Sequence, residues 1–379
     1  MYVSVSPSLS LRDLSTLARG QMSSYNNGIL YNSGRAALCA ALRLAAVEKG
    51  SIVAIPSYIC DVVPDSLRKA GYAIAYYDVQ RDLRVSVAEL LRTVSQRVRA
   101  LVVVHYFGFP QENIGEIAEF ARCRGIFLIE DCAHALLASH NGIPLGQFGD
   151  AAIFSLWKIL PVPDGGLLVM KERSPGEKAW DHAPGSSGIP GILRLLISRF
   201  AEKVALSPDR ATRLWGRLSG RGQNRADFEE SVRGLAQDVP VGPSFATRLL
   251  LARLDPARVS RRRRRNYRIF VSSLDELKGA ALRRVMPEGA CPWAIPLFLD
   301  RRDLIRDALA RHGIEAPSWP RLPKEVKKDE GSTAVLLARK ILLLPVHQNV
   351  SASNMSKMAA MLKGVAGQLG VWRPGGSTQ

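Results

Sequence analysis

The chain of 379 residues is 47% hydrophobic and 23% charged, and it carries a formal net charge of +18. This length and composition support one large domain with a smaller one and exclude a globally disordered chain. No run of about 18 consecutive apolar residues is present, so we expect no membrane-spanning helix. The first 20 residues lack the basic start and apolar core of a signal peptide. Five cysteines without Cys-x-x-Cys spacing favour a reduced, cytoplasmic setting and no metal site.

The first half of the chain alternates between strand-like and helix-like patterns. The predicted strands are short apolar runs at 51–56, 73–79, 100–107, 126–131, 151–156 and 166–170. Segments with helical spacing lie between them, at 36–50, 62–71 and 112–125. They end in Gly50, Gly71 and Gly125, and glycine is typical of helix C-termini. The alternation predicts a mainly parallel sheet covered by helices on both faces.

Residues 171–240 interrupt this alternation. They begin with loop-like sequence, and residues 191–206 then have the pattern of an amphipathic, basic helix. We expect that helix to pack on the body of the protein, with a membrane surface or a partner protein as the alternatives. A long helix is predicted over 244–267, followed by a smaller α+β pattern. The predicted domains are a large α/β domain, 1–245, and a small C-terminal α+β domain, 246–379.

The positive charge is concentrated in the C-terminal third. Residues 1–170 contain 15 basic and 14 acidic side chains, whereas residues 241–379 contain 25 and 11. This excess attracts anions such as nucleotides, phosphorylated sugars, nucleic acid or an acidic membrane surface. The five arginines at 261–265 would point around most of a helix, so we expect a solvated helix and no specific nucleic-acid site. A peripheral membrane contact is compatible with the charge, but no other feature supports it.

Three chemically useful features follow predicted strands. Asp131 and His134 come at and after the end of one strand, Lys158 follows another, and the turn at 32–38 enters a helix. Each is unremarkable alone, since such an aspartate usually caps a helix and such a lysine usually reaches solvent. Together, a carboxylate, an amine and a helix N-terminus at one sheet edge match the needs of pyridoxal phosphate. The motifs GxGxxG, GxSxG and HExxH are absent, which disfavours dinucleotide, serine-hydrolase and zinc-protease sites.

These segments resemble the DegT/DnrJ/EryC1/StrS family of pyridoxal-phosphate-dependent sugar aminotransferases. The resemblance lies in NSGRAAL, IVAIPSYICDVV, VVVHYFGFP, GIFLIEDCAHALLASHNGIPLGQFGDAAIFSLWK and DGGLLV, and more weakly in LLLARLD, CPWAIPLFLDRRDLIRDALARHGIEAP and LLLPVH. It implies the fold type I of pyridoxal-phosphate transferases, with a mainly parallel sheet of the seven-stranded type and a small C-terminal domain. It also implies a homodimer with active sites at the subunit interface.

The resemblance assigns roles to individual residues. Lys158 corresponds to the Schiff-base lysine, Asp131 to the partner of the pyridine nitrogen, and His134 to a residue beside the cofactor. Ser155 corresponds to a serine that touches the phosphate. The turn whose amides and hydroxyl hold that phosphate maps onto Gly34, Arg35 and Ala36.

The chain also departs from the family pattern. Ser155 and Lys158 are three positions apart where the family usually has five, and Asp164 replaces a common glutamate. The ring-stacking aromatic maps onto Cys60, so we expect Tyr58 to stack in its place. The asparagine that reaches the phosphate from the partner subunit has no clear counterpart near 235–245. His347 lies where the family has a histidine near the substrate entrance, and His105 is either a strand-end packing residue or a neighbour of the cofactor.

The predicted function is a transaminase that moves an amino group, with glutamate as the expected donor, to a keto sugar, most plausibly nucleotide-linked. Such sugars serve cell-surface polysaccharides and secondary metabolites. One alternative is another pyridoxal reaction such as sugar dehydration, although the family's dehydratases replace the lysine with histidine. A second is a non-catalytic binding or regulatory protein on the same fold, and a third is a nucleic-acid or membrane-surface protein that binds through the basic C-terminal third.

Overall fold

The computed structural model describes residues 2–10, 25, 27–172, 186, 188–203, 241–274, 282–283 and 285–370. Much of the predicted interruption at 171–240 lies outside the described residues, and so do residues 235–240 of the region 235–245 in which the family has its asparagine. No helix in the described ranges has the length and apolarity needed to cross a membrane.

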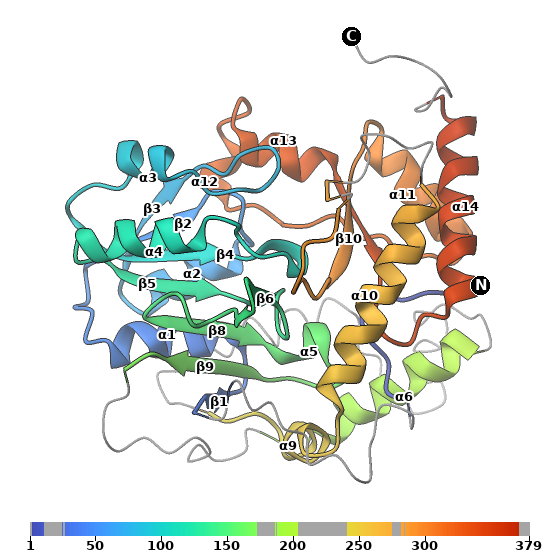
Figure 1. Ribbon diagram of the computed structural model, residues 1–379, viewed down its shortest axis with the longest axis horizontal. Coiled ribbons are helices and arrows are strands. Elements are labelled where there is room, and N and C mark those ends of the chain that lie inside the picture. The colour runs from blue at the N-terminus through green and yellow to red at the C-terminus, as the bar shows by residue number, and fades with distance from the viewer. Residues whose placement is uncertain are drawn as a thin grey trace.

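A seven-stranded sheet forms the centre of the N-terminal part (Figure 1). Its strands, in spatial order, are β1 (Ile29–Tyr31), β9 (Gly166–Met170), β8 (Ala151–Ser155), β5 (Phe127–Asp131), β4 (Val98–Val104), β2 (Ile52–Pro56) and β3 (Ala73–Tyr77). The pairs from β8 to β3 are parallel, and β9 runs antiparallel to β8 and β1. The predicted mainly parallel sheet is thus confirmed, and all six predicted strands are present. The short β1 had no strong signal in the sequence.

Helices connect the parallel strands and pack on the sheet. They are α1 (Gly34–Leu44), α2 (Val62–Lys69), α3 (Val87–Thr93) and α4 (Ile114–Cys123). A 3₁₀ turn, η3 (Tyr106–Gly108), a small hairpin of β6 (Ser139–His140) and β7 (Ile143–Pro144), and the one-turn helix α5 (Leu156–Ile159) complete this part. The interiors of β4 and β5 are almost fully buried, as expected for parallel strands covered on both faces.

The prediction that helices end at glycines is correct for the second and third predicted helices and wrong for the first. Gly71 and Gly125 adopt positive φ directly after the ends of α2 and α4. Helix α1 instead ends at Leu44, because Ala46 takes the positive φ of 52° and its N–H bonds back to the Arg43 carbonyl.

The C-terminal part is a smaller α+β unit. An antiparallel pair, β10 (Ala294–Phe298) and β11 (Ile341–Pro345), packs with helices around it. These helices are α10 (Pro256–Ser272), α11 (Arg302–Arg311), α12 (Lys324–Lys327), α13 (Thr333–Lys340) and α14 (Ala352–Gln368). The buried apolar residues of both parts belong to one continuous core. The boundary near residue 245 therefore remains a prediction.

The single long helix predicted from residue 244 to 267 is wrong. The structure has two helices, α9 (Phe245–Leu251) and α10, separated by a break at Leu254 and Asp255. The Asp255 side chain caps α10 by accepting from the Arg258 N–H at 2.9 Å, and Pro256 follows at the first helical position. This Asp-Pro pair is a helix-start signal that interrupts the apolar periodicity. Helix α10 crosses from α9 toward α14 and passes beside α5 (Figure 1).

Candidate active site

The predicted site residues gather at the carboxyl edge of the parallel strands. Asp131 is the last residue of β5, Ser155 is the last residue of the neighbouring β8, and Lys158 follows within α5. Cys60 lies in the connection that leaves β2 at the same edge. Ligands of open α/β sheets bind at this edge, because the loops that leave it diverge and form a crevice.

Lys158 is held in a largely apolar setting. Burial lowers the pKa of its amine, although the nearby Asp131 and Cys60 act in the opposite direction and Arg35 adds to the lowering. Its Nζ stands 5.2 Å from the centre of the Trp293 ring. A lowered pKa makes the neutral form of an amine more accessible, and a neutral amine can act as nucleophile and base. The setting of Lys158 thus suits the reactive role that the resemblance implies for it.

The two adjacent carboxylates, Glu130 and Asp131, have separate functions. Glu130 is fully buried and accepts from the Gly146, Phe148 and Gly149 N–H groups at 2.7 to 3.0 Å, and from His105 Nε2 at 3.0 Å. Burial alone would raise the pKa of Glu130, but the bonds and charge of His105 and the backbone N–H groups lower it overall.

His105, which bonds to Glu130, has a structural role. Its Nδ1 accepts from the Gln111 N–H at 3.0 Å, so its proton is on Nε2 and faces Glu130. Of the two alternatives for His105, the geometry supports the packing role. Among the described residues, one cluster of possible metal ligands is found, His105, Glu130 and Cys132. The hydrogen bonds described above already use the side chains of His105 and Glu130.

Asp131, in contrast, interacts electrostatically with the Lys158 amine. It accepts one bond, 2.9 Å from the Ala133 N–H, and burial raises its pKa while Lys158 and His105 pull it down. A buried carboxylate that interacts electrostatically with Lys158 can hold a protonated ring nitrogen, as the resemblance implies for this position.

The start of α1 lies against the end of β8. An added Cβ at Gly34 would lie 3.4 Å from the Phe154 carbonyl oxygen and 3.6 Å from Ser155 Cβ. On the other side, an added Cβ at Gly166 would approach Ser33 O to 2.1 Å and Gly34 N to 2.5 Å, so only glycine fits. The Ser33 side chain caps the helix by accepting from Ala36 N–H at 3.2 Å. The turn of Gly34, Arg35 and Ala36 thus lies beside Ser155, one short turn before Lys158, where a phosphate would meet a helix N-terminus.

His134 is buried within an aromatic cluster. Its ring stacks on Trp293 with the centroids 4.2 Å apart and on Phe107 at 5.7 Å, and the Trp319 ring meets it edge to face at 4.7 Å. Burial and the charge of Lys158 lower its pKa well below the usual value, so His134 is neutral. The contact of His134 with a cofactor remains a prediction.

Tyr58 and Cys60 occupy different surroundings. The Tyr58 ring is fully buried between Tyr106 and Trp319, and its hydroxyl donates to the Trp319 carbonyl at 2.5 Å. Cys60 interacts electrostatically with Lys158, and burial raises the pKa of its thiol. Cys60 is therefore near enough to affect the amine, and Tyr58 belongs to the aromatic cluster that includes Trp319 and Tyr106. Stacking of Tyr58 on a cofactor stays a prediction.

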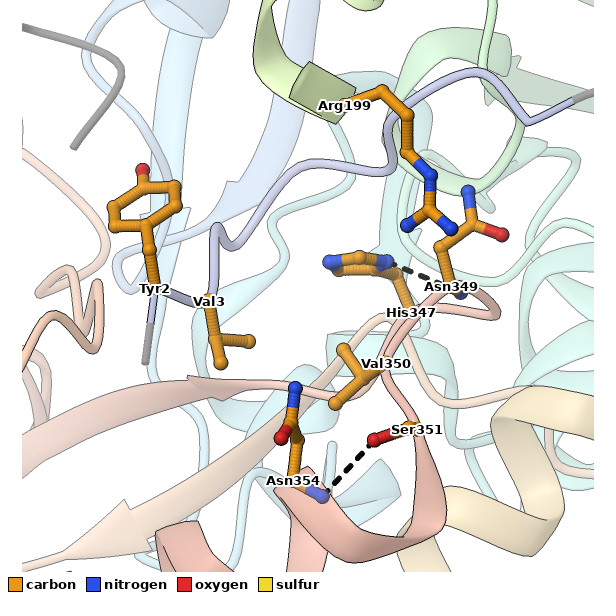
Figure 2. A pocket seen from close by; sticks show the side chains of 8 residues that line it. All are labelled: Tyr2, Val3, Arg199, His347, Asn349, Val350, Ser351 and Asn354. Carbon is orange, nitrogen blue, oxygen red and sulfur yellow. Dashed lines mark hydrogen bonds between the residues drawn. The ribbon is translucent and has the colours of Figure 1, made fainter. Parts of the chain in front are cut away.

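Asp164 and His347 have structural contacts. The Asp164 carboxylate accepts from Ser244 N–H, from Ser244 Oγ and from Thr247 Oγ1, which anchors the start of α9. His347 lines a cavity of about 180 Å³ together with Arg199 and Asn349. Figure 2 shows the side chains of Arg199 and Asn349 close to its imidazole. Burial, reinforced by Arg263 and Arg199, lowers the pKa of His347 to about 3.

Arg263 and Trp293 are site residues that the sequence did not reveal. Arg263, inside the arginine run, is fully buried, which corrects the expected solvated helix at this position. Its guanidinium donates to the carbonyls of Lys158 and Ile159 at 3.4 and 2.9 Å. It also donates to the carbonyls of Pro292 and Trp293 and to Gln348 Oε1, at 3.0 to 3.2 Å. One guanidinium thus connects the lysine turn to the C-terminal part.

A signal for Arg263 does exist in the sequence. The buried positions of α10 include Val259, Arg263, Tyr267 and Phe270, which are spaced by four, four and three residues. Arg263 therefore occupies the apolar face of the helix, while Arg261 and Arg265 are exposed.

The donor set fits pyridoxal phosphate. A reactive amine, a buried carboxylate and a glycine-built helix start are brought to one sheet edge, and the Gly166 contact shows that the helix start is held tightly against the strand. This combination is the set of groups that pyridoxal phosphate requires in an α/β protein.

The comparisons with known proteins agree. Residues 21–181 match the sequence model of the DegT/DnrJ/EryC1/StrS aminotransferase family, which confirms the resemblance over this segment. The aminotransferase TlmJ from Streptoalloteichus hindustanus has the same fold, with a TM-score of 0.69 and 19% identity over 97% of this chain and 100% of that one. The fold type I architecture is thereby confirmed.

Sequence relatives match over a limited length. The dTDP-4-dehydro-2,3,6-trideoxy-D-glucose 4-aminotransferase of Saccharopolyspora spinosa is 33% identical over 143 residues, 37% of each chain. The GDP-perosamine synthase of Escherichia coli O157:H7 is 28% identical over 38% of this chain and 40% of its own. The matched segments thus span about two fifths of these relatives.

Proposed function

We propose that the protein is a pyridoxal-phosphate-dependent aminotransferase that transfers an amino group, with glutamate as donor, to a nucleotide-linked keto sugar. The observation that carries this proposal is the half-buried Lys158, whose amine interacts with the buried carboxylate of Asp131 near the start of α1. The product class suits the building of cell-surface polysaccharides or secondary metabolites.

Lys158 is the catalytic residue of this proposal. Bound pyridoxal phosphate supplies an electron sink that stabilises negative charge on the carbon from which a proton is removed. Lys158 Nζ holds the cofactor and then takes and returns that proton, for which its burial and lowered pKa suit it. Asp131 keeps a proton on the ring nitrogen. Ser155 and the turn of Gly34, Arg35 and Ala36 bind the phosphate, and the aromatic cluster with Tyr58 and Cys60 excludes water.

The substrate assignment rests on charge and on relatives. The 25 basic side chains of residues 241–379 favour a substrate that carries a diphosphate. The names of the two relatives refer to dTDP- and GDP-linked sugars, and this chain is 33% and 28% identical to them over the matched segments. The five cysteines are free, which suits a cytoplasmic enzyme.

A homodimer is part of the proposal. Helix α6 (Ile189–Lys203) packs its Gly191 on Pro163, beside the lysine turn, as the predicted packing on the body requires. Large apolar side chains are exposed on α6 and α9, namely Ile189, Leu193, Leu196, Phe200, Phe245 and Leu249. An exposed apolar surface of this kind supports an interface with a second copy. Light scattering of the purified protein should give twice the mass of one chain.

The test begins with the cofactor. The purified protein, incubated with pyridoxal phosphate, should gain a visible absorption band, and borohydride should fix the cofactor on Lys158, located by peptide mass spectrometry. Glutamate should then abolish the band, and a panel of nucleotide keto sugars should yield an amino sugar by mass spectrometry. No visible band with the full-length protein would refute the proposal.

A second candidate is a binding or regulatory protein on the same fold. A relative named as a pleiotropic regulatory protein of Geobacillus stearothermophilus is 27% identical over 156 residues, and the aromatic expected at Cys60 is missing here. This candidate predicts cofactor binding without turnover of glutamate. Conversion of the bound cofactor by glutamate would exclude it.

A further inference from the structure

We propose that Trp293 is a binding residue of this site, whose indole forms the wall on which a planar ring held at Lys158 stacks. This inference rests on the proposed function, since it requires that pyridoxal phosphate binds at Lys158. It assigns an aromatic wall to the C-terminal part of the chain, on the segment that leads into β10.

The position of the indole carries the inference. The Trp293 ring lies 5.2 Å from Lys158 Nζ and stacks on His134 at 4.2 Å with an interplanar angle of 23°. Its side chain is 7% exposed. A planar group joined to Nζ begins about one bond length from an atom that already lies over the indole, so the two rings come within stacking distance. His134 then packs behind the indole and holds it in place.

The backbone of Trp293 is fixed by contacts that leave little freedom. Its N–H donates to the Phe107 carbonyl at 2.8 Å, and its own carbonyl accepts from Arg263 at 3.2 Å. Next to it, Cys291 N–H donates to the Gly108 carbonyl at 3.0 Å, and an added Cβ at Gly108 would come within 2.1 Å of the Cys291 oxygen. Because the same Arg263 also binds the Lys158 and Ile159 carbonyls, the indole and the amine are fixed relative to each other.

The ring-stacking aromatic of the family maps onto Cys60, so another side chain has to provide the stacking surface. The short side chain of Cys60 interacts electrostatically with Lys158 but has no ring with which to stack. The Tyr58 hydroxyl is engaged in a hydrogen bond to the Trp319 carbonyl. Trp293 is the aromatic side chain with a recorded cation–π contact to Lys158 in the described part of the chain.

The experiment measures the dissociation constant of pyridoxal phosphate by equilibrium dialysis with the full-length protein. Trp293→Ala and Trp293→Leu should weaken binding about tenfold, and Trp293→Phe should stay within about threefold of the wild type, because a smaller ring still stacks. Trp157→Ala is the matched control, since Trp157 neighbours Lys158 in sequence but is 37% exposed. It should bind like the wild type. Trp293→Phe should also lose the largest share of the tryptophan fluorescence quenching that the cofactor causes.

The outcomes separate the two proposals. Leucine keeps the apolar volume, so a folded Trp293→Leu protein tests stacking even where alanine prevents folding, and thermal unfolding without cofactor reports the structural contribution. Equal dissociation constants for the wild type and Trp293→Leu would overturn the role of Trp293 while leaving the proposed function intact. A wild-type protein that does not bind pyridoxal phosphate would overturn the proposed function itself, and this inference with it.

Discussion

The N-terminal sheet and the C-terminal third contribute to the site in different ways. The sheet supplies Asp131, Ser155 and Lys158 from the ends of neighbouring parallel strands, so their proximity follows from local sequence and strand order. The C-terminal third supplies Arg263 and Trp293, which reach the lysine only through packing of α10 and the segment before β10. The positions of the polar groups thus follow from the order of the strands in the sheet. The positions of Arg263 and Trp293, which hold and cover these groups, follow from tertiary packing.

The largest effect is expected on the sheet side of this comparison. Lys158→Ala should lower transamination at least about 10³-fold, because it removes the group that holds the cofactor and moves the proton. The assay is conversion of a nucleotide keto sugar with glutamate, followed by mass spectrometry. Trp157→Ala is the neighbouring control and should keep activity within a few fold. Comparable turnover by Lys158→Ala would show that the amine has no catalytic part.

On the C-terminal side, Arg263→Leu should destabilise the protein by about 3–5 kcal/mol, because five carbonyl and amide acceptors lose a buried cation. Arg261→Leu, two positions earlier and exposed, should change the free energy of unfolding by less than about 0.5 kcal/mol. Urea unfolding measures both. If the two variants had the same free energy of unfolding, the buried hydrogen bonds of Arg263 would not contribute to stability.

Two glycine substitutions of opposite sign test the helix start. Gly166→Ala should cost about 1–3 kcal/mol, since its Cβ would collide with the Ser33 and Gly34 backbone. It should also weaken cofactor binding, because that backbone must shift. Gly364→Ala, within α14 and with nothing near its Cβ, should stabilise the protein by about 0.5–1 kcal/mol. Thermal unfolding of both variants gives the comparison, and stabilisation by Gly166→Ala would contradict the contact.

The smallest effect concerns pH and His347 in the C-terminal part. Its folded pKa of about 3 lies below the usual 6.5, so the unfolded chain binds more protons between these values. Stability from this residue is therefore present above pH 6.5 and is lost as the pH falls toward 3, by at most about 1.4 kcal/mol per unit. His347→Gln should flatten the fall between pH 7.5 and 5.5, measured by urea unfolding. The exposed His312→Gln should not change it.

The difference between the N-terminal sheet and the C-terminal third also explains which features the sequence predicts. The strands of the sheet and the edge that holds Asp131 and Lys158 follow from apolar runs and alternation, and these were predicted correctly. The break before α10 was missed because the apolar periodicity runs through it, although Asp255 and Pro256 mark a helix start. The run of five arginines predicts a solvated helix, and this charge pattern conceals that Arg263 lies at a position of the apolar face. Nothing local to Trp293 indicates that it lies over a lysine 135 positions earlier, since only the folded chain brings them together.

The guanidinium of Arg263 has a consequence for how the protein is made. Its acceptors range from residue 158 to residue 348, so this cation can hold the turn that carries Lys158 only after residue 348 has been synthesised. N-terminal segments fold first during synthesis. The sheet can therefore assemble before the turn that carries Lys158 is held in place.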